Sequence, residues 1–111
     1  MLVSKSSPFG GRTRTLVLMA LSVLQESFPR ELARVLKAPL NGIQQALRSL
    51  ENDGLVVGRT AGRTRLFRLN PSYFARGELA TYLGRLVEPE AVLKERVSQL
   101  RKRPRRTNKP L

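Results

Sequence analysis

Residues 31–71 decide the fold, and they read ELARVLKAPLNGIQQALRSLENDGLVVGRTAGRTRLFRLNP. Apolar residues recur at helical spacing in the first part and form two short runs typical of strands after Gly54. Pro39 disfavours helical backbone at the residue before it, so the helical part divides in two. The stretch therefore predicts two helices joined by a tight turn and followed by a β-hairpin.

Residues that start or stop helices set the boundaries of these elements. Pro29 suits the first turn of a helix that ends near Lys37. A second helix runs over about 40–53 and ends at a glycine, which adopts the left-handed backbone of a helix stop at no steric cost. The expected strands are 55–57 and 64–69, with a glycine-containing turn between them.

Three further helices are expected outside this stretch. Residues 13–25 are apolar nearly all round, so we expect this helix to be buried on two sides, one in the domain core and one in a subunit interface. The segments 73–87 and 89–101 each carry one apolar stripe. We expect both to pack a homodimer together with the first helix. The expected fold class is mainly α with a small β-hairpin.

Composition limits the chemistry that the chain can perform. The 111 residues suffice for one domain, and 41% of them are apolar, enough for a packed core. The sequence contains no cysteine and no histidine, which excludes disulfides, thiolate or imidazole metal ligands and imidazole catalysis. The eight acidic residues show no metal-ligand spacing. We expect no enzyme, no cofactor and no metal.

The sequence also bears on location. The longest apolar run, residues 16–24, is too short to span a bilayer. The first fifteen residues lack the order of a secretory signal. We expect a cytoplasmic, nucleoid-associated protein.

Positive charge is concentrated in two parts of the chain. Lys and Arg number 21 against 8 Asp and Glu, a net charge of +13. Residues 29–70 carry eight positive and three negative side chains, and residues 101–111 carry six positive and none negative, whereas 71–100 are neutral with four of each. Such an excess indicates a polyanionic partner, nucleic acid before anionic membrane. The alternative is a basic surface that serves solubility alone.

Four pieces of the sequence together resemble the winged helix-turn-helix of ArsR- and MarR-type transcriptional regulators. They are FGGRTRTLVLMAL, ELARVL, IQQALRSLENDGLV and GRTAGRTRLFRLNP, and they span residues 9–71. The resemblance implies a recognition helix at about 40–53 and an arginine-bearing wing. Without cysteine or histidine, the metal sensing of ArsR-type proteins is not implied, and the turn Lys37-Ala38-Pro39 lacks the usual glycine.

Composition, helix patterns and this resemblance together predict four parts of the chain. Residues 1–11 form an N-terminal arm and 12–71 the DNA-binding domain. Residues 72–101 form C-terminal helices for dimerisation, and 102–111 form a basic disordered tail.

The residue types on the third helix and the hairpin suit contact with double-stranded DNA. If the apolar positions of the third helix face the core, its amide and guanidinium side chains face outward, where Gln pairs with adenine and Arg with guanine. Arginines of the wing suit phosphates or the minor groove, and those before the first helix suit phosphates. The predicted DNA-binding residues are Asn41, Gln44, Gln45, Arg48, Arg59, Arg63, Arg65, Arg12 and Arg14. The prediction requires the third helix and the hairpin to present them on one exposed surface.

Other interpretations remain open from the sequence. The third-helix residues suit an ordinary solvated helix face, and the wing arginines suit protection of a strand edge. The whole protein could bind nucleic acid without base preference, as a nucleoid or RNA-binding winged helix, or could be a winged-helix module that binds protein.

Overall fold

Five helices and one antiparallel hairpin make up the part of the chain, residues 10–102, that the computed structural model describes. In order they are α1 (Arg12–Leu24), α2 (Pro29–Leu36), α3 (Leu40–Asn52), β1 (Val56–Ala61), β2 (Thr64–Leu69), α4 (Arg76–Val87) and α5 (Ala91–Lys102). The predicted fold class, mainly α with a small hairpin, is confirmed. Residues 1–9 of the expected arm and 103–111 of the expected tail lie outside the described residues.

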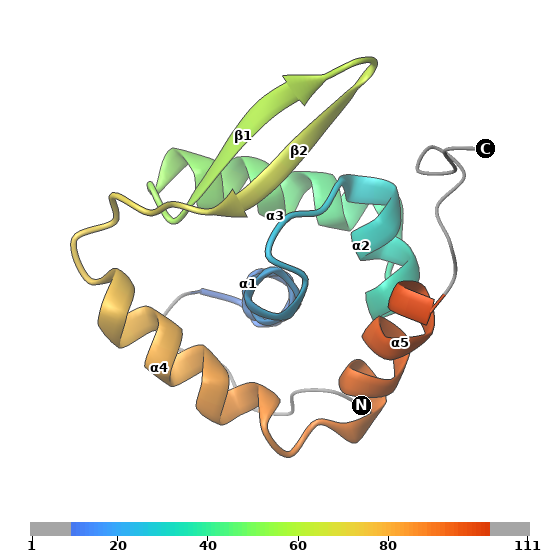
Figure 1. Ribbon diagram of the computed structural model, residues 1–111. Helices are drawn as coiled ribbons and strands as arrows, with labels where there is room; N and C mark the ends of the chain where they lie inside the picture. Colours follow the sequence, from blue (N-terminus) through green and yellow to red (C-terminus); the bar gives the residue numbers. More distant parts are fainter. Residues whose placement is uncertain (1–9, 103–111) are drawn as a thin grey trace.

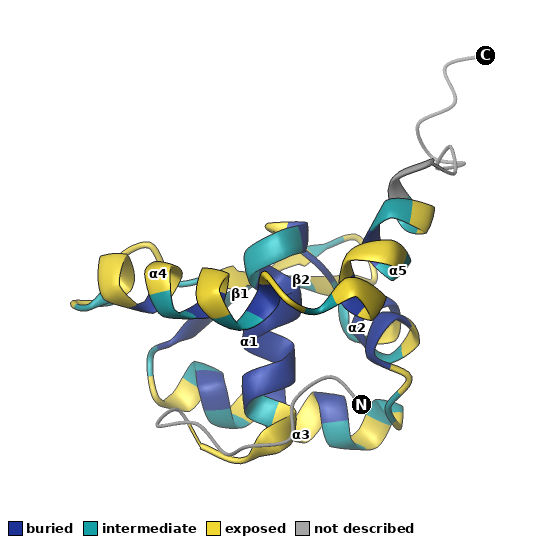
Figure 2. Ribbon diagram, turned by 90° about the horizontal axis from the view of Figure 1, so that it is seen from below, coloured by how far each residue is buried: buried dark blue, intermediate teal, exposed yellow. Residues whose placement is uncertain are grey.

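The first helix is the centre of the molecule. The other helices and the hairpin surround α1, which is seen end-on in Figure 1. Residues 17–21 of α1 are fully buried, and most of the helix is buried in Figure 2. The sequence led us to expect one face of this helix in a subunit interface, and that expectation is wrong, because elements of the same chain already cover it.

The two C-terminal helices belong to the same core. Leu79 and Leu83 of α4, and Leu93 and Val97 of α5, are buried in the cluster that also holds the apolar side of α1. A hydrogen bond of 2.7 Å from Arg96 Nη1 to the carbonyl oxygen of Val35 joins α5 to the end of α2. Across residues 10–102, no helix has the length and apolar character needed to cross a membrane.

A left-handed lysine forms the turn between α2 and α3. Lys37 has φ 52° and ψ 51°, the conformation that glycine usually supplies at the end of a helix. The N–H of Ala38 donates to the carbonyl of Ala33 at 3.0 Å, and Pro39 follows in extended conformation to begin α3. Lys37 thus adopts the left-handed backbone at the position where a glycine is usual.

The hairpin is anchored at its base and open at its tip. The register pairs Ala61 with Thr64, which leaves a two-residue turn with Gly62 at φ 63°, as type II′ turns require. β1 is longer than expected because pairing continues to this turn. At the base, the backbone of Phe67 exchanges two hydrogen bonds with Ser27, at 3.0 and 2.7 Å. The wing is thereby fixed to the segment between α1 and α2.

The enclosure of α1 makes a prediction about stability. Leu18→Ala should lower the free energy of unfolding by about 2–5 kcal/mol, since Leu18 is fully buried and the cavity can collapse only in part. Val92→Ala is the control: it truncates a side chain that is 46% exposed and should change the free energy by less than about 0.5 kcal/mol. Urea denaturation followed by circular dichroism measures both. Equal losses would contradict the central position of α1.

Candidate nucleic-acid interface

α3 presents a polar face to solvent along its whole length. Its apolar residues Ile43, Ala46, Leu47 and Leu50 are buried against the core. The residues exposed on the opposite side are Asn41, Gln44, Gln45, Arg48 and Asn52. All four residues of α3 that the sequence marked for DNA contact are thus accessible.

The exposed residues of α3 fall into two groups. Asn41, Gln45, Arg48 and Asn52 follow one another at helical spacing and form a single outward row. Gln44 lies beside this row, toward the hairpin, where it lines a hollow together with Arg63. Sequence reasoning missed Asn52, although its spacing from Arg48 was the signal for it.

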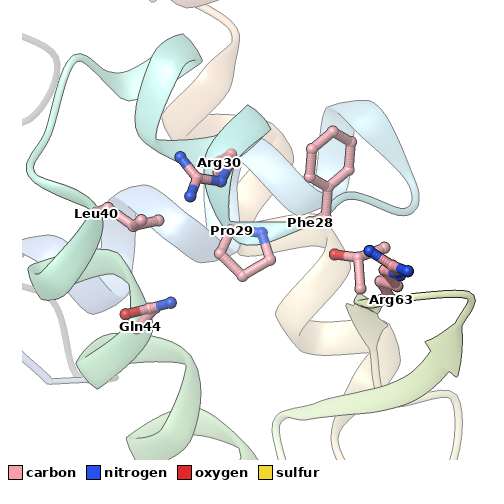
Figure 3. Close-up of a pocket in the computed structure, with 7 residues that line it drawn as sticks. Phe28, Pro29, Arg30, Leu40, Gln44 and Arg63 are labelled. Atoms are coloured by element: carbon pink, nitrogen blue, oxygen red, sulfur yellow. The ribbon is translucent and has the colours of Figure 1, made fainter.

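A groove separates α3 from the wing. It consists of two hollows of about 420 and 410 Å³ that share Pro29, Gln44, Arg63 and Thr64 in their walls. Phe28, Pro29 and Leu40 give the first hollow an apolar lining, and Figure 3 shows Pro29 between Gln44 of α3 and Arg63 of the wing. Arg30, which the sequence did not single out, lines the same hollow. Guanidinium groups therefore reach this groove from α2, α3 and the wing.

The wing arginines do not share one surface. The register places Arg59 opposite Leu66 and Arg65 opposite Thr60, so Arg59 and Arg65 lie on opposite faces of the hairpin. Arg65 lies on the face toward α3, where it lines the second hollow, and Arg63 is exposed in the turn. The expectation of a common surface is wrong for Arg59.

Arg14 is held at the far end of α3. Its Nη1 atom donates to Ser49 Oγ at 2.6 Å and to Asp53 Oδ2 at 2.7 Å, and its side chain is only 18% exposed. These contacts join the start of α1 to the end of α3. Arg12, two residues earlier, is exposed at the first position of α1.

Ion pairs divide the arginines of this region into two sets. Arg14 pairs with Asp53, Arg65 with Glu51 at 2.9 Å, and Arg59 with Glu26 at 3.1 Å. These pairs involve every acidic side chain exposed or half-buried between residues 10 and 70, because Glu31 is buried and accepts a hydrogen bond from Ser27.

The remaining arginines around the groove give it a positive charge. Within the described residues Arg30, Arg48 and Arg63 are exposed and make no ion pair within 4.0 Å. The hydrogen bonds and the negative charge of Glu51 raise the pKa of Arg65 above its ordinary value, so Arg65 also stays charged. No three acidic side chains gather as metal ligands in this part of the chain.

Comparison with solved structures identifies the fold. The chain superimposes on a ZitR variant from Lactococcus lactis with a TM-score of 0.61 and 21% identity, over 88% of this chain and 66% of ZitR. It superimposes on the adhesin competence repressor AdcR from Streptococcus pyogenes with a TM-score of 0.57 and 20% identity, over 84% of this chain and 67% of AdcR. The chain thus spans about two thirds of each of these proteins.

ZitR has also been solved with DNA. That complex of a ZitR variant matches with a TM-score of 0.54 and 24% identity, over 92% of this chain and 82% of the ZitR chain. No protein-family model and no curated protein sequence matches the chain. Likeness to the ArsR type in particular stays a prediction. The shared architecture shows that the chain has the winged helix-turn-helix fold found in ZitR and AdcR.

Proposed function

We propose that the protein is a DNA-binding transcriptional regulator that lays α3 in the major groove. The observation that carries the proposal is the groove between α3 and the wing, which Arg30, Arg48 and Arg63 surround without an acidic partner among the described residues. The same fold occurs in a ZitR variant solved in complex with DNA.

The row on α3 supplies the groups that read bases. The major groove admits one α-helix, and each base pair displays a distinct pattern of donors and acceptors there. Arg48, near the middle of the row, has the chemistry for a bidentate contact with guanine, and Gln45 and Gln44 have the chemistry for adenine. Asn41 and Asn52, at the two ends of the row, extend it along the groove.

The wing and α2 position the protein on the backbone of the duplex. Arg63 at the tip and Arg30 at the start of α2 are exposed guanidinium groups that line the same hollow beside α3, suited to phosphates or to the minor groove. Arg12 is a further proposed phosphate contact. Arg14 and Arg59 would contact DNA only where a phosphate replaces Asp53 or Glu26 as partner.

A homodimer is part of the proposal. Because α1 is enclosed, we place the dimer contact on α4 and α5, where Val92 of α5 and Phe74, two residues before α4, are large apolar side chains exposed to solvent. A dimer would place two copies of α3 about one DNA turn apart, ~34 Å.

Binding without base preference is the second candidate function. The six positive charges of residues 101–111 favour it, since such a segment attracts any polyanion. Affinity measurements at one salt concentration separate the two candidate functions. They compare a duplex selected from random sequence with a scrambled duplex and with structured RNA. Equal affinities would favour the second candidate.

Arg48→Ala should relax base preference. We expect affinity for the selected duplex to fall by about 1–3 kcal/mol, while affinity for scrambled duplex falls less, because a bidentate base contact is lost. Fluorescence anisotropy and repeated site selection measure this. Arg68→Ala is the matched control, since Arg68 is exposed on the hairpin face away from α3. If Arg48→Ala selects the same site as the native protein, the role of Arg48 is refuted. Two inverted half-sites in the duplex that the native protein selects would support the dimer.

Arg63→Ala should weaken binding to all duplexes alike. Losing one phosphate contact removes one released counterion, so the slope of log affinity against log salt should become shallower by about 1. Anisotropy titrations at four salt concentrations give the slope. If Arg63→Ala keeps the salt slope of the native protein, the wing tip does not contact the phosphate backbone of DNA.

Truncation after Lys102 should lower the salt slope and leave site choice intact. Residues 103–111 contain four positive charges, and losing four phosphate contacts would reduce the slope by about 3–4. The same titrations, with site selection on the truncated protein, provide the measurement. A slope equal to that of the full chain would remove this segment from the mechanism.

A further inference from the structure

The side chain of Arg65 connects the wing to α3. Its Nη2 and Nη1 atoms donate to the two carboxylate oxygens of Glu51 at 2.9 and 3.4 Å. The guanidinium carbon lies 4.9 Å from the centre of the Phe67 ring. Phe67 is itself buried, and its backbone is bonded to Ser27. The contacts thus run from α3 through Arg65 to the anchored base of the hairpin.

Gly58 provides the space that this arrangement needs. It lies opposite Phe67 in the register, and a Cβ atom there would come within 2.5 Å of Arg65 Nη2 and 2.8 Å of Phe67 Cε2. The φ of Gly58 is not positive, so the backbone does not require glycine. The absence of a side chain is what lets Arg65 lie over the ring.

These contacts lie between the two proposed DNA-binding groups. Arg63 is two residues before Arg65 on the wing, and Arg48 is one helical turn before Glu51 on α3. Glu51 and Arg65 both line the hollow between them. The restraint at Glu51 and Arg65 therefore limits how far Arg63 can move from Arg48.

We propose that Arg65 is a positioning residue, which fixes the distance from α3 to the wing tip and so selects duplexes whose groove widths fit that distance. The proposal rests on the proposed function. DNA groove width varies with sequence, so a fixed spacing contributes specificity at bases that no side chain touches. Arg65 then differs from Arg63, which contacts DNA directly.

Glu51→Gln separates positioning from direct contact by the sign of its effect. If Arg65 bound phosphate, Glu51 would compete with it, and the variant would bind DNA more tightly. If Arg65 positions the wing, the variant should bind the selected duplex about two- to fivefold more weakly than its control, since partly exposed ion pairs contribute up to ~1 kcal/mol. The wing strands should also exchange their amide hydrogens faster in the protein without DNA.

Glu26→Gln is the matched control. It removes the same charge and breaks the corresponding pair with Arg59 on the opposite face of the hairpin. Each variant loses one negative charge and releases one hairpin arginine, Arg65 or Arg59, to a phosphate. Both therefore gain attraction for DNA in the same two ways, and weaker binding by Glu51→Gln reports the spacing of the wing. Equal or tighter binding by Glu51→Gln than by Glu26→Gln would overturn the proposal.

Arg65→Lys gives an independent test. Lysine keeps the positive charge that a phosphate contact needs but lacks the planar fork that binds Glu51 twice and stacks on Phe67. We expect its affinity for the selected duplex to fall as in Glu51→Gln, and full affinity would overturn the positioning role. If the native protein binds no DNA, the proposed function fails, and the amide exchange of Glu51→Gln alone tests the role of Arg65. Faster exchange in the wing of this variant than in the native protein supports the restraint. Unchanged exchange overturns it.

Discussion

Burial of α1 on every side is the constraint on which the rest of the molecule depends. Five consecutive side chains of this helix, residues 17–21, have no contact with solvent. α2, α3, the hairpin, α4 and α5 can therefore each bury their apolar side against the same helix (Figure 1). The polar faces of α3 and the wing consequently point away from the centre. The elements that carry the surface proposed for DNA are thus supported by one shared core.

Ion pairs with acidic side chains then determine which arginines of that surface remain available to bind an anion. Glu26, Glu51 and Asp53 each hold one arginine that lies 14 or more residues away in the sequence. Exposed pairs of this kind contribute little to stability, but they orient side chains and remove negative charge from the neighbourhood of a polyanion. Under the proposed function, the excess of basic residues would act through a few side chains at the groove.

Much of the fold could be predicted from local signals, and the site only in part. Pro29, Pro39 and Gly54 mark helix boundaries through backbone rules that hold in any context, so α2 and α3 lie where expected. The partners of Arg14 and Arg65 lie 39 and 14 residues away, and no periodicity indicates such contacts. The role of α1 was misjudged for a similar reason: an apolar helix looks the same in sequence whether its own chain or a second copy covers it.

Because the hairpin is anchored below its tip, the sequence of its turn can change without disturbing the core. Contacts to Ser27, Glu51 and the Phe67 ring all lie at or below Arg65, whereas the Gly62-Arg63 turn extends beyond them. Insertions or exchanges at the turn leave every buried contact in place. Evolution, or an engineer, can therefore alter the reach and charge of the tip separately from the folding of the domain.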